Sequence, residues 1–286
     1  MNGLVGAVVT TPGQGAIDSF FRLHRVAGQS HDDGAALQVR GVLQSYQEIL
    51  ADLEFGTTVA QADIDALTRS FAALLTAWAG LPTAARDIRP LPPGTVQPWR
   101  TEPPALRRWL RGHHAFVALI QGLTCAIDAL LGSSQDPDPG AAAERLALMT
   151  VLVEGAEASL RLTGDLGEGA YERDVRIWMI PPHSPPGLTG LDLWEHSHLL
   201  VRVRALGRTA DLADGPLHGP LASLRTAWAA LYQAHSYVCT RFVAPTEGSL
   251  LVKSDGPPVA TTLDRLARSR VRLLPTPSPA LACEDH

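Results

Sequence analysis

Apolar side chains recur every three or four residues along most of the chain, the spacing that places them on one face of an α-helix. The clearest stripe, within residues 36–56, comprises Leu43, Tyr46, Leu50 and Leu53. A similar stripe predicts a second helix over about 61–80. No stretch shows a convincing alternation of apolar and polar residues, which a half-buried β-strand would need. The pattern therefore predicts an all-α protein.

Segments rich in proline and glycine separate the predicted helices. Residues 81–104 hold seven prolines and predict a loop. Residues 171–180 lack the helical stripe and are predicted to form a short strand or an extended segment. Further helices are expected at about 103–131, 141–163, 191–206, 221–242 and 261–271. We expect one helical domain over residues 1–286, with a Pro-rich C-terminal tail beyond Pro245.

Composition narrows the classes of function. The net charge of −5 gives no electrostatic reason to expect a nucleic-acid or anionic-membrane partner. The sequence contains no run of about 18 apolar residues and therefore predicts no membrane span. The N-terminal apolar patch lacks the basic region of a signal peptide, so we expect a cytoplasmic protein. The cysteines are too few and too scattered for a disulfide framework: Cys125, Cys239 and Cys283.

The most informative chemistry lies in two consecutive predicted helices. His235 and Cys239 are four residues apart, so a helix places them on one face, one turn from each other. His196 lies on the preceding helix with 38 residues between it and His235, and mostly apolar neighbours share its face. Two imidazoles can hold an iron from both sides, and a thiol one turn away could reach a porphyrin edge. These residues predict a haem with two histidine ligands and one covalent thioether to Cys239.

Other interpretations of the same residues stay open. Each histidine alone could be a core residue bonded to a backbone carbonyl. His198 has Trp194 and Val201 on its own face and is a rival to His196 as iron ligand. His235 and Cys239 could instead form a thiolate–imidazolium nucleophile. A zinc site lacks support because no C-x-x-C or H-E-x-x-H spacing is present, and the usual C-x-x-C-H haem-attachment motif is also missing.

The segment from Trp194 to Gly207 resembles the haem-ligand helix of the tryptophan 2,3-dioxygenases, where W-x-x-x-H is followed nine residues later by glycine. The segment 45–54 also resembles an early active-site helix of that family. The histidine that precedes this helix in the dioxygenases is not matched, because Val39 and Arg40 occupy the region. The resemblance implies a tryptophan 2,3-dioxygenase-like helical fold around a haem, and it favours His198 as the ligand.

The spacing His-x38-His-x-x-x-Cys is similar to a branch of the same superfamily, the haem-dependent aromatic oxygenases of natural-product pathways. Within that family it is most similar to the hydroxylases that act on 3-methyl-L-tyrosine in saframycin biosynthesis. This resemblance favours His196 over His198, because it also accounts for Cys239. It implies peroxide-dependent hydroxylation of 3-methyl-L-tyrosine or L-tyrosine, ortho to the phenol hydroxyl.

Substrate-binding residues are harder to predict. An amino-acid carboxylate is best met by an arginine fork, and the candidates are Arg40, Arg173 and Arg176. The loop 183–190 is a plausible lid because it leads into the first histidine helix, and its polar residues include His183, Ser184 and Thr189. His113 and His114 are further candidates for the pocket lining. The oligomeric state stays open, with a homo-oligomer as one option.

Two alternative functions accompany this hypothesis. One is a tryptophan or indole oxygenase of the same superfamily. The other is a non-catalytic haem-binding sensor or carrier, since two histidine ligands suit electron transfer or sensing equally well.

Overall fold

The computed structural model describes residues 12–23, 31–54, 56–79, 102–132, 138–184, 193–209, 215–242 and 259–276. Within these ranges every regular element is helical, which confirms the all-α prediction. The α-helices are α1 (Pro12–Phe21), α2 (His31–Leu53), α3 (Gln61–Ala79), α4 (Pro104–Gly132), α5 (Pro139–Thr163), α6 (Trp194–Leu206), α7 (His218–Phe242) and α8 (Val259–Val271). Each helix predicted from the sequence is present, with ends that differ by a few residues.

Helix α5 shows how local sequence sets an element's limits. The Asp138 side chain accepts a hydrogen bond from the backbone N–H of Gly140 at 2.9 Å, and Pro139 follows at the first helical position. This is the usual chemistry of a helix start. Gly164 ends the helix, as predicted, and its N–H donates to the Leu160 carbonyl.

The extended segment predicted at 171–180 is wrong. A π-helical turn, η2 (Tyr171–Val175), runs into a 3-10 turn, η3 (Arg176–Met179). The ion pair between Arg176 and Glu172, 2.8 Å long at i and i+4 spacing, favours helical backbone. No described strand lies beside the segment to pair with it. Helix α1 was not predicted either, and a short 3-10 turn, η6 (Gly215–Leu217), precedes α7.

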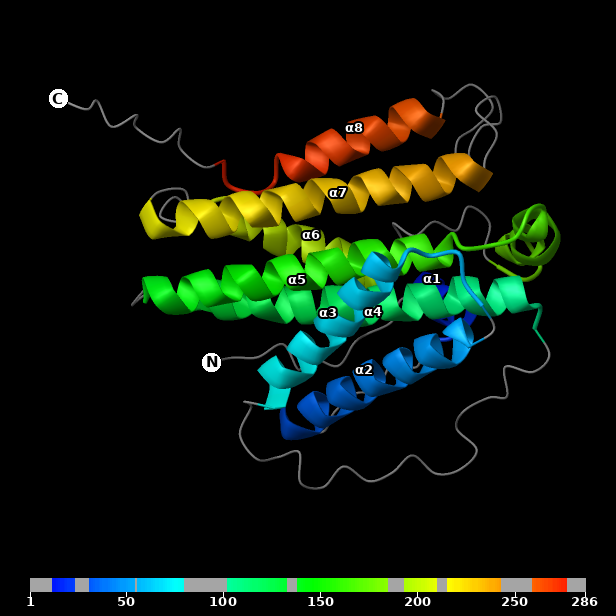
Figure 1. The fold of residues 1–286 in the computed structure, drawn as a ribbon, viewed down its shortest axis with the longest axis horizontal. Helices are drawn as coiled ribbons and strands as arrows, with labels where there is room; N and C mark the ends of the chain where they lie inside the picture. Colours follow the sequence, from blue (N-terminus) through cyan, green and yellow to red (C-terminus); the bar gives the residue numbers. More distant parts are fainter. Residues whose placement is uncertain are drawn as a thin grey trace.

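The helices stack in layers (Figure 1). Helices α4 and α5 lie side by side at the centre, with α2 and α3 packed on one side and α7 on the other. Helix α8 covers the outer side of α7, and α6 packs against α4. Of the two helices that carry the predicted iron ligands, α6 therefore packs on α4, whereas α7 packs on α5.

The central core is a continuous apolar cluster shared by these layers, and some of its fully buried members are Phe71, Leu119, Leu146, Leu152 and Trp228. Close approach of α3 and α5 depends on Gly155, because an added Cβ would lie 2.2 Å from Ser70 Oγ. The Ser70 hydroxyl donates to the Val151 carbonyl at 2.6 Å across the same contact. A second apolar cluster lies at the end of the bundle where α1, α4, η2 and η3 meet.

Among the described residues, α4 alone is long and apolar enough to cross a membrane by length and composition. Its most apolar stretch is 67% buried inside the bundle, as expected for a central core helix. The length test therefore gives only weak support for a membrane span.

Several predictions fall outside the described residues. They concern the proline-rich loop at 81–101, Thr189 with most of the proposed lid, Cys283 and the Pro-rich tail apart from α8. The single-domain prediction for residues 1–286 and the dioxygenase-like part of the fold stay predictions.

Candidate functional site

Helix α7 places His235 and Cys239 on one face, as the four-residue spacing predicts. The Cys239 Sγ lies 3.5 Å from His235 Nε2, and both side chains are half-buried. Burial lowers the pKa of His235 and raises the pKa of Cys239 to about 11. At neutral pH the pair is therefore a neutral imidazole and a protonated thiol. A thiolate–imidazolium nucleophile would need the opposite shifts.

Helix α6 contributes His196 to the same region. Its Nδ1 is buried and has no hydrogen-bond partner. Burial, followed by the positive charges of Arg270 and His235, lowers its pKa to about 4. The charge of His235 contributes to this shift, so the two predicted iron ligands are electrostatically coupled. The stripe predicted around His196 is also buried, with Leu199, Leu200 and Val203 on that side of the helix.

The rival ligand His198 lies in a different environment. Its ring stacks on Trp194 with centroids 4.7 Å apart, and the Trp194 side chain is 42% exposed. Burial and then the nearby Arg202 lower the pKa of His198. His235 has no such influence on it. The structure thus brings His196, and not His198, toward the α7 pair, while the assignment of the iron ligand stays a prediction.

Aromatic side chains that the sequence did not single out surround this end of α7. Tyr171 of η2 stacks on Phe242 with ring centroids 4.6 Å apart. Burial raises the pKa of Tyr171 to about 12, and the nearby Cys239 adds to the rise. Both rings pack against the second apolar cluster, which also contains Trp109 and Phe21. A weak signal was present in the sequence, because Phe242 follows Cys239 by three residues.

The two neighbouring histidines of α4 have separate surroundings. His113 lies 4.0 Å from Trp109 and 5.1 Å from Phe21, ring centroid to centroid, and its Nδ1 lies 2.7 Å from the Trp109 carbonyl. Burial lowers its pKa to about 4, and the charges of His114 and His235 contribute. His113 thus borders the α7 pair. His114 instead contacts Glu48 at 3.1 Å and the Phe21 carbonyl at 2.6 Å.

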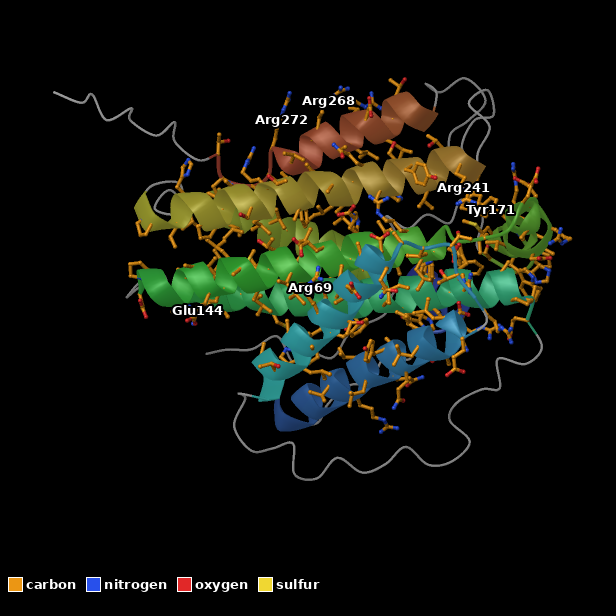
Figure 2. The ribbon with its side chains drawn as sticks, viewed as in Figure 1. Arg69, Glu144, Tyr171, Arg241, Arg268 and Arg272 are labelled. Carbon is orange, nitrogen blue, oxygen red and sulfur yellow. The ribbon has the colours of Figure 1, made fainter. Side chains whose placement is uncertain are left out.

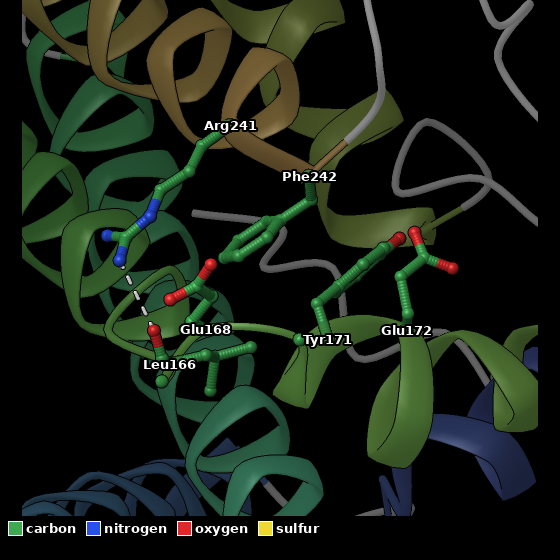
Figure 3. Close-up of a pocket in the computed structure, with 8 residues that line it drawn as sticks. Leu166, Glu168, Tyr171, Glu172, Arg241 and Phe242 are labelled. Carbon is green, nitrogen blue, oxygen red and sulfur yellow. Dashed lines mark hydrogen bonds between the residues drawn. The ribbon is translucent and has the colours of Figure 1, made fainter.

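A cavity of about 250 Å³ opens beside the stacked pair (Figure 3). Its lining includes Glu168, Tyr171, Glu172, Arg241 and Phe242. The Arg241 guanidinium donates to the carbonyls of Gly164 and Leu166, at 3.3 and 3.2 Å. It therefore serves mainly to cap the end of α5. A second cavity, of about 320 Å³, adjoins the first through residues 166–168.

Two of the predicted carboxylate-binding arginines already pair with carboxylates of the chain itself. Arg173 pairs with Asp174 at 3.1 Å, and Arg176 pairs with Glu172. Their local acidic neighbours therefore already occupy them. Arg40 has a buried Nη2 without a hydrogen-bond partner, but its charge influences none of the three predicted haem residues.

The start of the predicted lid is described, and most of it is not. His183 is exposed, and its ring lies tilted against Trp178 with centroids 4.4 Å apart, while Ser184 is buried. Among the described residues, no three or more His, Cys, Asp or Glu side chains group closely enough to hold a metal ion without further ligands. The cluster offers two imidazoles and one thiol.

Comparison with known proteins identifies the family. The family model described as SfmD 3-methyl-L-tyrosine peroxygenase matches residues 6–223, a segment that includes His196 and ends before His235 and Cys239. A 3-methyl-L-tyrosine peroxygenase of Streptomyces lavendulae is 36% identical over 149 residues, which are 51% of this chain and 40% of that relative. No solved structure matches the chain. Because the family model covers most of the sequence, the chain belongs to the SfmD 3-methyl-L-tyrosine peroxygenase family.

Proposed function

We propose that this chain is a haem-dependent peroxygenase that hydroxylates a phenolic amino acid, with 3-methyl-L-tyrosine as the first candidate. The observation that carries the proposal is the His235–Cys239 pair, 3.5 Å apart on α7, in a chain that belongs to a peroxygenase family; the buried, unpartnered Nδ1 of His196 supports it. His196 and His235 would be the iron ligands. Cys239 would form the single thioether.

The side chains present fit a haem. The buried Nδ1 of His196 has no partner, which is costly unless the ring serves a purpose there. Lowered pKa values keep both imidazoles neutral, as iron ligation requires. The protonated Cys239 thiol lies one turn from His235, where it could add to a porphyrin vinyl group.

Bound haem would supply the redox-active iron that activates peroxide. The chain's own residues would hold the group, orient the substrate ring and exclude water. The stacked Tyr171 and Phe242 and the neighbouring Trp109 give one end of the site an aromatic, apolar wall. Such a wall favours packing of a phenol ring. It also keeps the nearby imidazoles desolvated.

A turnover assay tests the proposal directly. The purified chain, loaded with haem, is mixed with hydrogen peroxide and with 3-methyl-L-tyrosine, L-tyrosine or L-tryptophan in separate reactions. We expect one added oxygen on the two phenols, ortho to the hydroxyl, with 3-methyl-L-tyrosine turned over fastest. Product masses and fragment spectra give the number of oxygens and the position.

Other outcomes point to the alternatives. Two added oxygens on tryptophan would indicate ring cleavage by an indole oxygenase. A haem-loaded chain that turns over no aromatic amino acid would favour a sensor or carrier. A role in natural-product biosynthesis is part of the proposal and would follow from the same substrate preference.

A further inference from the structure

The smaller of the two adjoining cavities, about 250 Å³ in volume, lies at the end of α7 that carries Cys239. Phe242, which lines this cavity, follows Cys239 by three residues. Val238, which precedes Cys239, packs closely on Gly164 at the end of α5, where an added Cβ would lie 2.9 Å from Val238 Cγ2. The cavity is therefore built where α7 meets the end of α5, next to the candidate haem attachment.

The segment that follows α5 forms one wall of the cavity and has a well-defined backbone. Residues 167–170 make a tight turn, in which the N–H of the last residue donates to the carbonyl of the first at 3.0 Å. Gly169 occupies the third position with a φ of 67°, which glycine adopts without steric cost. Arg241 of α7 donates to the Leu166 carbonyl at 3.2 Å just before the turn. Glu168, at the second position of the turn, is therefore held in place by its backbone.

Glu168 differs from the other carboxylates that line the two cavities. Glu172 pairs with Arg176 at 2.8 Å, and Asp165 accepts from Arg108 at 2.9 Å. The Glu168 side chain lines both cavities and is exposed. Within the part of the chain that the structure describes, no donor or cation pairs with it. The site therefore offers one negative charge that is available to a ligand.

An aromatic wall lies next to this charge. Phe242 and Tyr171 are stacked with an angle of 17° between their planes. Figure 3 shows the Glu168 side chain pointing from the turn toward the Phe242 ring. An ammonium group is attracted both to a carboxylate and to the face of an aromatic ring. The two features together favour a ligand that has an ammonium group close to an apolar ring.

Arg241 adds a positive charge to the same lining. Its Cζ lies 5.7 Å from the centroid of the Phe242 ring. Its hydrogen bonds to the carbonyls of Gly164 and Leu166 use only part of the guanidinium, which has further N–H groups for a carboxylate. A zwitterionic α-amino acid carries both of the charges that Glu168 and Arg241 would complement. The two adjoining cavities, of about 250 and 320 Å³, together lie within the size range of small-molecule sites.

We propose that this cavity binds the α-amino-acid part of an aromatic substrate. Glu168 accepts hydrogen bonds from the ammonium group, Arg241 donates to the carboxylate, and the ring of the ligand packs against Phe242. The inference rests on the proposed function, because that function supplies a phenolic amino acid as the ligand. It also transfers the role expected of the arginines at 40, 173 and 176 to Arg241.

The test measures binding by calorimetry to the full chain after incubation with haemin. The first probe is 3-methyl-L-tyrosine, which carries both charged groups. The second, 3-methyltyramine, has no carboxylate, and the third, 3-(4-hydroxy-3-methylphenyl)propanoic acid, has no ammonium group. Glu168→Gln removes the charge and keeps the size of the side chain. Glu144→Gln is the matched control, because Glu144 is an exposed residue of α5 near the opposite end of the bundle from Tyr171 and Arg241 (Figure 2).

Glu168→Gln should weaken binding of 3-methyl-L-tyrosine and of 3-methyltyramine about 10-fold, because it removes a charge-assisted hydrogen bond to the ammonium group. Binding of the propanoic acid should stay as in wild type. A general disturbance of the structure would weaken all three probes instead. If Glu168→Gln matches Glu144→Gln for both amines, or if the propanoic acid loses the same affinity, the proposal is overturned.

Two further comparisons test the other contacts. The wild-type chain should bind 3-methyl-L-tyrosine more tightly than 3-methyltyramine, because only the amino acid has a carboxylate for Arg241. Phe242→Leu should weaken all three probes about 2- to 10-fold, since each has an aromatic ring that packs on the wall. Equal affinity for the first two probes contradicts the role of Arg241. Unchanged affinities in Phe242→Leu contradict the position of the ring.

The results of these titrations and of the turnover assay can be separated. A wild-type chain that binds 3-methyl-L-tyrosine but adds no oxygen to it contradicts the peroxygenase, and Glu168→Gln still decides the inference. Turnover with unimpaired binding by Glu168→Gln contradicts the inference alone. A wild-type chain that neither binds nor converts any probe contradicts both. Circular dichroism of each variant confirms that the helices are retained.

Discussion

Two polar clusters inside this bundle differ in how completely they are paired. In the first, which we call the carboxylate–arginine network, Asp52 accepts from Arg108 and Arg111 at 2.5 and 2.9 Å. Asp165 accepts from Arg108 at 2.9 Å and from the hydroxyls of Thr57 and Thr58. All four carboxylate oxygens have partners. In the second cluster, His196 keeps a buried Nδ1 without a partner beside His235 and Cys239.

We propose that the fully paired cluster stabilises the fold and that the incompletely paired cluster has a functional role. The paired network joins α2, the turn before α3, α4 and the end of α5, so it holds the fold together. Burial alone would raise the pKa of Asp165, but hydrogen bonds from Thr57 and Thr58 and the charge of Arg108 bring it below its usual value. Within the described residues, the histidine cluster gains no such compensation. A buried group left unpaired costs stability, and this cost supports our proposal that a ligand completes the cluster.

The largest effect on stability should come from breaking the paired network. Asp52→Ala removes the carboxylate that pairs with Arg111 and one of the two carboxylates that pair with Arg108. We expect a loss of about 3–5 kcal/mol in the free energy of unfolding. Chemical denaturation followed by circular dichroism measures it. A loss below about 1 kcal/mol would mean that the network is not structural.

Substitution in the histidine cluster should change haem binding strongly and the free energy of unfolding only slightly. His196→Phe and His235→Phe remove desolvated polar rings, so the haem-free chain should change stability by only about 1 kcal/mol, in either direction. Haem binding should nevertheless be lost or the low-spin absorbance spectrum should change. Denaturation and absorbance spectra on the same samples give both numbers. Large destabilisation with an unchanged spectrum would mean that the histidine cluster stabilises the fold and does not bind haem.

Cys239→Ala should affect only the attachment of haem. Acid–acetone should leave colour with the wild-type protein and extract it from the variant, and intact mass should show one haem on the wild type alone. The exposed Cys125 provides the matched control, because Cys125→Ala should behave as wild type. Equally easy extraction from wild type and Cys239→Ala would contradict the thioether.

The free energy of unfolding of the haem-free chain at acidic pH provides a further test of this comparison. An unfolded histidine titrates near ~6.5, whereas burial holds the pKa of His113 at about 4 in the folded chain. As the pH falls from about 6.5 to about 4, the unfolded chain therefore takes up a proton that the folded chain refuses, and stability decreases. In the haem-free chain, His113→Phe should make this decrease smaller. Denaturation midpoints between pH 7 and pH 4.5 provide the measurement.

The smallest effect is expected at His198, which lies on the exposed Trp194 and not in the cluster. His198→Phe should change the free energy of unfolding by less than about 0.5 kcal/mol. It should also leave the haem spectrum as in wild type. If this variant loses the spectrum while His196→Phe keeps it, the dioxygenase-like assignment of the ligand is correct.

The sequence by itself determined most of the α-helices and the identity of the chemical groups. Helical periodicity and end signals such as Gly164 act over a few residues, so they can be read locally. The same holds for His235 and Cys239, because one turn of helix brings them together whatever the rest of the chain does. The stretch at 171–180 shows the limit: it lacks a helical stripe and so predicts an extended segment, whereas its i, i+4 ion pair between Glu172 and Arg176 favours helical backbone.

Only the tertiary structure decided which groups meet across elements. His196 and His198 are two residues apart, and the packing of α6 on α4 turned the first toward α7 and the second toward the surface. Arg173 and Arg176 pair with acidic residues one and four positions away, so they are not free to bind a ligand carboxylate. The physical reason is that periodicity fixes the face of a helix only relative to its own axis. Which partner that face meets depends on burial and on contacts between helices far apart in the sequence.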